Sequence, residues 1–164
     1  MGFRIGRKHA AHTYPSSQGN STLLFARNFA QGPAAPQEIT ASPVNVGWAS
    51  IESGATPGTS VPITPKQTGL LLITGVVEME NGGEVPVNVQ IQVAVGGITV
   101  ATPATEVTVG AGAFATVPVQ ALVGQAVGAT YDISLVVTVS VLSALTLNTN
   151  DSTLSVREVP AATG

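Results

Sequence analysis

Hydrophobic and polar residues alternate along several stretches of the chain after residue 38. The clearest runs are 85–95 and 131–141, where Val, Ile and Leu occupy every second position, and a shorter run at 115–121 is interrupted by Pro118. A period of two places successive side chains on opposite faces of a β-strand, so this pattern predicts half-buried strands. Shorter segments with strand character are 44–51, 60–64, 70–79, 106–109, 144–147 and 153–159.

Turn residues separate these runs. Asn81-Gly82-Gly83 and Gly96-Gly97 each lie between two alternating segments, which predicts a β-hairpin at both places. The polar stretch Asn148–Asp151 indicates an Asx-rich turn. Prolines within strand-like segments belong on edges or at strand starts, because proline cannot donate to a ladder; these are Pro43, Pro62, Pro86 and Pro118. Many short strands without a helical period predict an all-β sandwich or barrel.

The first 37 residues differ from the rest of the chain. They show no sustained period, contain no Asp or Glu, and hold four of the six Lys and Arg residues. We therefore expect an extended basic N-terminal arm, 1–37, followed by a β-sandwich domain, 38–164. The arm would bind a partner through its aromatic and basic side chains, Phe3, Arg4, Arg7, Lys8, Tyr14, Phe25, Arg27 and Phe29. The alternative is a solvated leader with no partner.

The surface of the predicted domain carries few charges. Asp, Glu, Lys and Arg make up 9% of the chain, against roughly 25% in ordinary soluble domains. On two predicted strands the outward positions are neutral, where a free sandwich carries Lys and Glu to prevent association. These candidates for a self-interface are Asn88, Gln90, Gln92, Ser134, Val136 and Thr138. A homo-oligomer is expected.

Catalytic and metal-binding arrangements are weak in this sequence. The absence of Cys excludes disulfides and thiolate sites. His9 and His12 have helical spacing for a metal but no third ligand nearby, and Asn148–Asp151 offers calcium-type oxygens but suits a turn better. Glu78 and Glu80 share one side of a strand, where a solvated strand end explains them better than acid–base catalysis. We expect no enzyme activity, no metal and no cofactor.

The sequence also bears on nucleic acid and membranes as partners. The basic arm has few positive charges and no aromatic platform between them, which favours an acidic protein surface over nucleic acid. The longest apolar run, 70–73, is far below the ~20 residues of a membrane span. The first residues lack the apolar region of a secretory signal. We therefore expect no membrane association and synthesis in the cytoplasm.

Two segments of the predicted domain have a recognisable arrangement: Pro65-Lys-Gln-Thr-Gly69 runs into the strand 70–79, and the strand 152–159 closes the domain. With these segments, the chain from about Val44 onward resembles the tumour necrosis factor and complement-collagen type of jelly roll. Small proteins of this type with an N-terminal arm resemble the decoration (cement) proteins of tailed-phage heads and some phage fibre tips. The resemblance implies a jelly-roll-type antiparallel β-sandwich that forms homotrimers.

This resemblance also implies a function. We expect a structural virion protein that binds the outer head shell, stabilises it, and docks its arm on neighbouring subunits of the major capsid protein. The expected location is the capsid surface, after synthesis in the host cytoplasm. The alternative is a recognition module, a receptor- or glycan-binding head-fibre or tail-fibre tip. An enzyme of the jelly-roll hydrolase or cupin kind would need His residues in the domain, where the sequence has none.

Overall fold

The computed structural model describes residues 25–32, 35–52, 58–100, 104–142 and 144–159, without the side chains at 149 and 150. The described residues form twelve strands and no helix, so in this part of the chain no helix could cross a membrane. The strands are β1 (Arg27–Gln31), β2 (Gln37–Glu38), β3 (Val44–Asn45), β4 (Ser50–Ile51), β5 (Val61–Ile63), β6 (Gly69–Asn81), β7 (Val87–Val95), β8 (Ile98–Thr99), β9 (Thr105–Val109), β10 (Phe114–Gln125), β11 (Tyr131–Val139) and β12 (Leu145–Val159).

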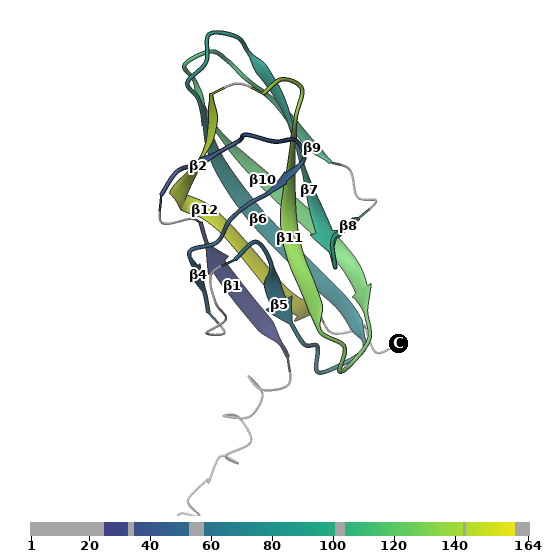
Figure 1. The fold of residues 1–164 in the computed structure, drawn as a ribbon. Helices are drawn as coiled ribbons and strands as arrows, with labels where there is room; N and C mark the ends of the chain where they lie inside the picture. Colours follow the sequence, from purple (N-terminus) through teal and green to yellow (C-terminus); the bar gives the residue numbers. More distant parts are fainter. Residues whose placement is uncertain (1–24, 33–34, 53–57, 101–103, 143, 160–164) are drawn as a thin grey trace, which may run out of the picture.

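The strands build two antiparallel sheets stacked face to face (Figure 1). Sheet I has the order β10-β6-β12-β1-β4, with β2 also paired to β12. Sheet II has the order β3-β11-β7-β8, with β5 also paired to β11 and β9 to β7. Within them, β1-β12-β6-β10 and β5-β11-β7-β9 form two four-stranded layers between which the chain passes repeatedly. This is the jelly-roll arrangement, and the predicted fold class is confirmed.

The core lies between the sheets and is built by the alternation seen in the sequence. Each long strand turns Leu, Ile, Val or Met inward at every second position, and burying this apolar surface is the main force that holds the sheets together. The largest fully buried side chains are Leu71, Ile73 and Met79 on β6, Ile91 on β7, Ile133 and Leu135 on β11, and Leu145, Leu147 and Leu154 on β12.

Gly75 leaves room in the core for a side chain of the facing sheet. It takes an inward position on β6, and a Cβ built there would lie 2.8 Å from Leu135 Cδ1 and 3.3 Å from the Thr153 carbonyl oxygen. A residue without a side chain therefore leaves room for a leucine of sheet II, as close packing requires. Packing, and not backbone conformation, therefore favours glycine at position 75, because the backbone there is ordinary strand.

Strand β1 corrects the predicted boundary at residue 37. Residues Arg27–Gln31 pair with β12 on one side and with β4 on the other, so they lie inside sheet I and not in an arm. The inward residues are Asn28 and Ala30, both buried. Since one is polar and the other small, this strand lacks the hydrophobic alternation that identifies the others. The remainder of the predicted arm, 1–24, lies outside the described residues.

Two of the predicted turns are also corrected. β6 and β7 belong to different sheets, so Asn81-Gly82-Gly83 begins a crossover between sheets and not a hairpin. Asn148–Asp151 lies within β12, where a bulge shifts the register: five residues from Asn148 to Thr153 match the step from Glu78 to Val76 on β6. The Gly96-Gly97 hairpin is confirmed, since Val95 pairs with Ile98 and both glycines have positive φ.

Candidate interaction surfaces

The outward side of sheet I carries a group of apolar side chains. In register, Leu122 of β10 pairs with Leu72 of β6, Pro118 pairs with Val76, and Val159 of β12 pairs with Leu70. Directly paired residues point to the same side of a sheet, so the six form one surface, here called the apolar face. Leu122 is 53% exposed and Leu70 is 40% exposed. Large side chains held at this exposure on a flat sheet are typical of a surface that another protein covers.

Charged residues border the apolar face. Arg157 pairs with Leu72 on one side and with Arg27 on the other, so two like charges lie next to each other beside the face. Further along β6, Glu78 and Glu80 point outward, alternating with the buried Val77 and Met79. Glu80 is eight residues along β6 from the position that pairs with Arg157, about 26 Å at strand rise.

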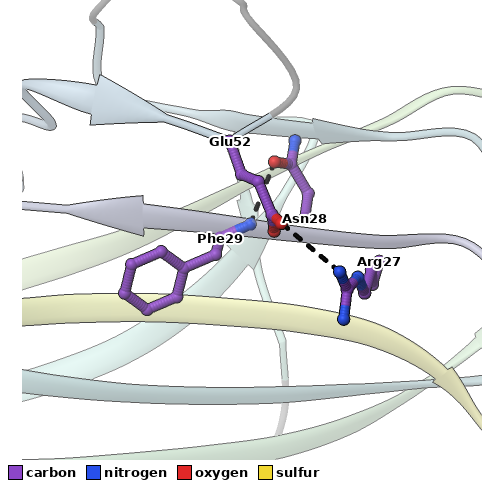
Figure 2. A network of polar contacts seen from close by, with 4 residues as sticks. All are labelled: Arg27, Asn28, Phe29 and Glu52. Carbon is purple, nitrogen blue, oxygen red and sulfur yellow. Dashed lines mark hydrogen bonds and ion pairs between the residues drawn. The ribbon is translucent and has the colours of Figure 1, made fainter.

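Figure 2 shows the environment of β1. The Arg27 guanidinium lies 3.5 Å from a Glu52 carboxylate oxygen, and because both side chains are exposed this ion pair contributes about 0–1 kcal/mol. The Asn28 side chain points the other way, accepting from the Phe29 amide at 2.9 Å and donating to the Pro62 carbonyl of β5 at 2.6 Å. Asn28 therefore links the two sheets. The Phe29 ring extends beside β12 and stays 39% exposed.

Glu158 attaches the chain entering β1 to the end of β12. Its carboxylate is 6% exposed and accepts hydrogen bonds from three backbone amides, those of Ala26, Lys66 (2.7 Å) and Gln67 (2.9 Å), and from the Gln125 side chain (3.3 Å). Burial raises the pKa of Glu158, but these hydrogen bonds to the charged form outweigh it and hold the pKa below the ordinary 4.5. All the hydrogen-bond donors to the Glu158 carboxylate are N–H groups, and through them it holds the chain entering β1 against the end of β12.

Asn81 organises the loops at one end of the sandwich. The side chain is fully buried, and its amide nitrogen donates to three carbonyls, those of Val85 (2.8 Å), Val109 (3.1 Å) and Gly110 (3.2 Å). Its oxygen accepts from the Gly83 amide at 3.0 Å. The Asn81 side chain thus holds the β6–β7 connection against the β9–β10 connection. These buried hydrogen bonds account for Asn at this position, where the chain makes no hairpin turn.

Sheet II has a different surface. Its outward side is hollowed over β9, β7 and β11, with a volume of about 460 Å³. The hollow is lined by six polar side chains in two cross-strand rows, Thr108–Asn88–Ser140 and Glu106–Gln90–Thr138. Within each row a side-chain hydrogen bond joins β9 to β7, since Thr108 Oγ1 donates to Asn88 Oδ1 at 2.7 Å and Gln90 Nε2 donates to Glu106 Oε1 at 3.1 Å. This surface is polar and holds one charged residue.

No family model matches the chain, and no curated protein matches it either. Among solved structures, Eiger TNF from S. frugiperda aligns with a TM-score of 0.48 and 10% identity, covering 85% of this chain and 96% of that one. Murine APRIL aligns with a TM-score of 0.46 and 11% identity, covering 82% and 99%. Similarities at this level describe the fold at most, and the jelly-roll assignment rests on the strand pairing itself.

The residues predicted to bind partners through the arm fall into two groups. Phe3, Arg4, Arg7, Lys8 and Tyr14 lie outside the described residues. The other three are predicted to belong to the arm, whereas Arg27 and Phe29 lie on β1 and Phe25 precedes that strand by two residues. Their exposed side chains lie on or next to the outward side of sheet I.

The predicted self-interface lies on sheet II. Asn88, Gln90 and Thr138 line the hollow, and Gln92 and Val136 form the next cross-strand pair. Ser134 is only 5% exposed and offers almost no surface. Nothing in the single chain tests this self-interface, and it stays a prediction.

Sequence reasoning missed the residues that organise these surfaces. Glu158 was detectable, because it continues the inward series Leu154–Val156 and a carboxylate at such a position needs buried partners. The apolar face was less visible, since Leu72 and Val76 alternate with residues that are equally hydrophobic. Among the described residues no group of three His, Cys, Asp or Glu side chains could hold a metal ion.

Proposed function

We propose that this chain is a structural virion protein, a decoration or cement protein that binds the outer head shell as a homotrimer and stabilises it. The observation that carries the proposal is the apolar face of sheet I. Its leucines are exposed although the chain has only 9% charged residues to keep it in solution. A surface of this composition is stable when it is covered.

The partner on this face is another copy of the same chain. Arg157 has no ion pair among the described residues, and it lies beside Arg27 on the same side of the sheet. Glu78 and Glu80 supply the opposite charge on the same sheet, so a second copy of the chain offers partners for the charges as well as for the apolar side chains. We therefore assign self-association to sheet I in preference to the polar row on sheet II. The number of three copies follows the sequence resemblance at 65–69 and 152–159.

The shell partner is the major capsid protein, bound through residues 1–24. This segment holds Arg4, Arg7 and Lys8, no acidic residue, and the aromatic residues Phe3 and Tyr14. Three segments on one trimer give a multivalent attachment, in which each bound segment raises the effective concentration of the next. Binding to the assembled shell alone stabilises the shell by linkage.

Co-sedimentation with heads assembled from the major capsid protein of the same virus tests this proposal. The full chain should bind and raise the temperature at which the heads break open. A chain lacking residues 1–24 should keep its oligomeric mass and lose binding. The deletion must stop before residue 25, because β1 belongs to the sandwich. A control that exchanges only Arg4, Arg7 and Lys8 for Ala separates charge from the aromatic anchors. Heads that bind the truncated chain as well as the full one would refute the docking role.

A second candidate function has its own supporting observation. The polar hollow on sheet II is the kind of surface that a recognition module would use, such as a receptor- or glycan-binding fibre tip. This candidate requires no shell partner, and head binding by the full chain together with loss of binding on deletion of 1–24 would favour the first function.

A further inference from the structure

The hollow on sheet II has the properties of a small-molecule site. Its volume of about 460 Å³ falls within the ~300–1,000 Å³ of such sites. Five of its six polar side chains come from the hydrogen-bonded strands β9, β7 and β11, and the sixth, Ser140, directly follows β11 and is hydrogen-bonded to Asn88, so their spacing is largely set by the sheet. A site on regular structure loses little conformational entropy on binding, because the side chains are already positioned.

The charges of the hollow exclude some ligand classes. Glu106 is the charged side chain of the lining, and no Lys or Arg lines it. An anion such as a phosphate or carboxylate would meet a negative charge without a counter-charge. A divalent cation would find one carboxylate, and such ions take six or more oxygen ligands with several charges. The remaining class is a polar ligand that is neutral or weakly cationic.

The hydrogen-bonding groups of the hollow fit hydroxyl groups. A carboxylate only accepts, so the Gln90 amide must turn its nitrogen to Glu106, which leaves Gln90 Oε1 directed elsewhere as an acceptor. Ser140 Oγ accepts from the backbone N–H of Asn88 at 3.1 Å, and the Ser140 hydroxyl proton stays available to donate. The Thr138 hydroxyl makes no hydrogen bond within the described chain. Donors and acceptors thus alternate over a short distance, and each hydroxyl of a sugar is both.

The shape of the hollow also argues against self-association through it. A concave patch needs a convex partner surface, and the flanking positions of the predicted self-interface, Gln92 and Val136, form one more cross-strand pair of the same sheet. A ligand that protrudes into the hollow matches it better. We propose that this hollow binds a neutral saccharide through Gln90, Thr138 and Ser140. The proposal goes beyond shell binding and does not depend on it.

Binding of the full chain to immobilised oligosaccharides tests the proposal. The panel contains neutral chains built from hexoses and N-acetylhexosamines, together with sialylated and uronic acid chains. Neutral chains should bind and acidic ones should not. Glu106→Gln should reduce this discrimination, because it removes the charge that repels acids. Binding restricted to acidic chains, or no binding of any neutral chain at millimolar concentration, would overturn the proposal.

Variants locate the site. Thr138→Val keeps the shape and removes the hydroxyl, and Ser140→Ala does the same at the next row. Each should weaken binding of the neutral chain about tenfold, which corresponds to the loss of one or two hydrogen bonds. The matched control is Thr99→Val on the exposed strand β8, outside both the hollow and the apolar face, which should leave binding unchanged. Equal affinity of the wild type and Thr138→Val, with both proteins folded, would place the ligand elsewhere and contradict the assignment.

Discussion

Replacing Glu158 with Gln tests the anchor that joins β12 to the chain entering β1. Both carboxylate oxygens accept from N–H donors: one from Ala26, the other from Lys66, Gln67 and Gln125. In either orientation the new amide turns its NH₂ group toward at least one of these donors. A buried N–H without an acceptor costs about 1–3 kcal/mol. The other bonds lose their charge assistance, while a neutral side chain is easier to bury.

The net effect should be a loss of about 2–4 kcal/mol in the free energy of unfolding at pH 7. Urea unfolding followed by circular dichroism measures it, with the slope of the transition unchanged. Glu84→Gln, at an exposed position in the β6–β7 connection, is the control and should change stability by less than about 0.5 kcal/mol.

The effect should also depend on pH. The pKa of Glu158 in the folded protein lies below its ordinary 4.5. The carboxylate therefore stabilises the fold fully above the unfolded pKa, and the contribution is lost as the pH falls below 4.5 through the folded pKa. The difference between the wild type and Glu158→Gln should be constant from pH 8 to 6 and shrink in acid. Equal stability at pH 7, or a difference that does not change between pH 7 and 3, would refute the role of the charged anchor.

Three further substitutions test separate features of the fold by the same unfolding measurement. Asn81→Asp replaces the donor to three carbonyls with an acceptor and should cost about 3 kcal/mol; a loss below 1 kcal/mol would show that the amide does not hold the loops. Gly75→Ala should cost about 1–3 kcal/mol because its Cβ would press on Leu135, and an unchanged midpoint would mean that the packing at Leu135 absorbs the methyl group without cost. Gly97→Ala meets no neighbouring atom but has a φ of +81°, so a loss of about 1–3 kcal/mol from backbone strain alone is expected, and no loss would contradict the hairpin geometry.

The alternation of residues predicted the strands with strong inward hydrophobic series, including β7 and β11, and with them the fold class. It could not say which sheet a strand joins, because a period of two specifies the faces of a strand and not its neighbours. For that reason the sequence pattern predicts a hairpin after Asn81, where the chain crosses from one sheet to the other. The bulge in β12 was missed because its residues, Asn148–Asp151, have the composition of a turn.

The interaction surfaces were harder to predict. β1 has Asn28 and Ala30 at its inward positions, and the partners that bury Asn28 are far away in the sequence. The polar row of β7 indicates an unusual free surface, but the hollow is lined from β9, β7 and the end of β11 together and has no local signature in the sequence. The apolar face likewise exists only once the register brings Leu122, Leu72 and Val159 together.

The most direct test of the central claim is the solution mass of the full chain by light scattering, compared with Leu122→Asp and Ile98→Asp. Both residues are exposed, but Leu122 lies on the apolar face and Ile98 on the β7–β8 hairpin of the other sheet. The wild type and Ile98→Asp should have three times the monomer mass, and folded Leu122→Asp should be a monomer. A wild type that stays monomeric at every concentration, or a trimer that survives Leu122→Asp, would contradict self-association through the apolar face of sheet I.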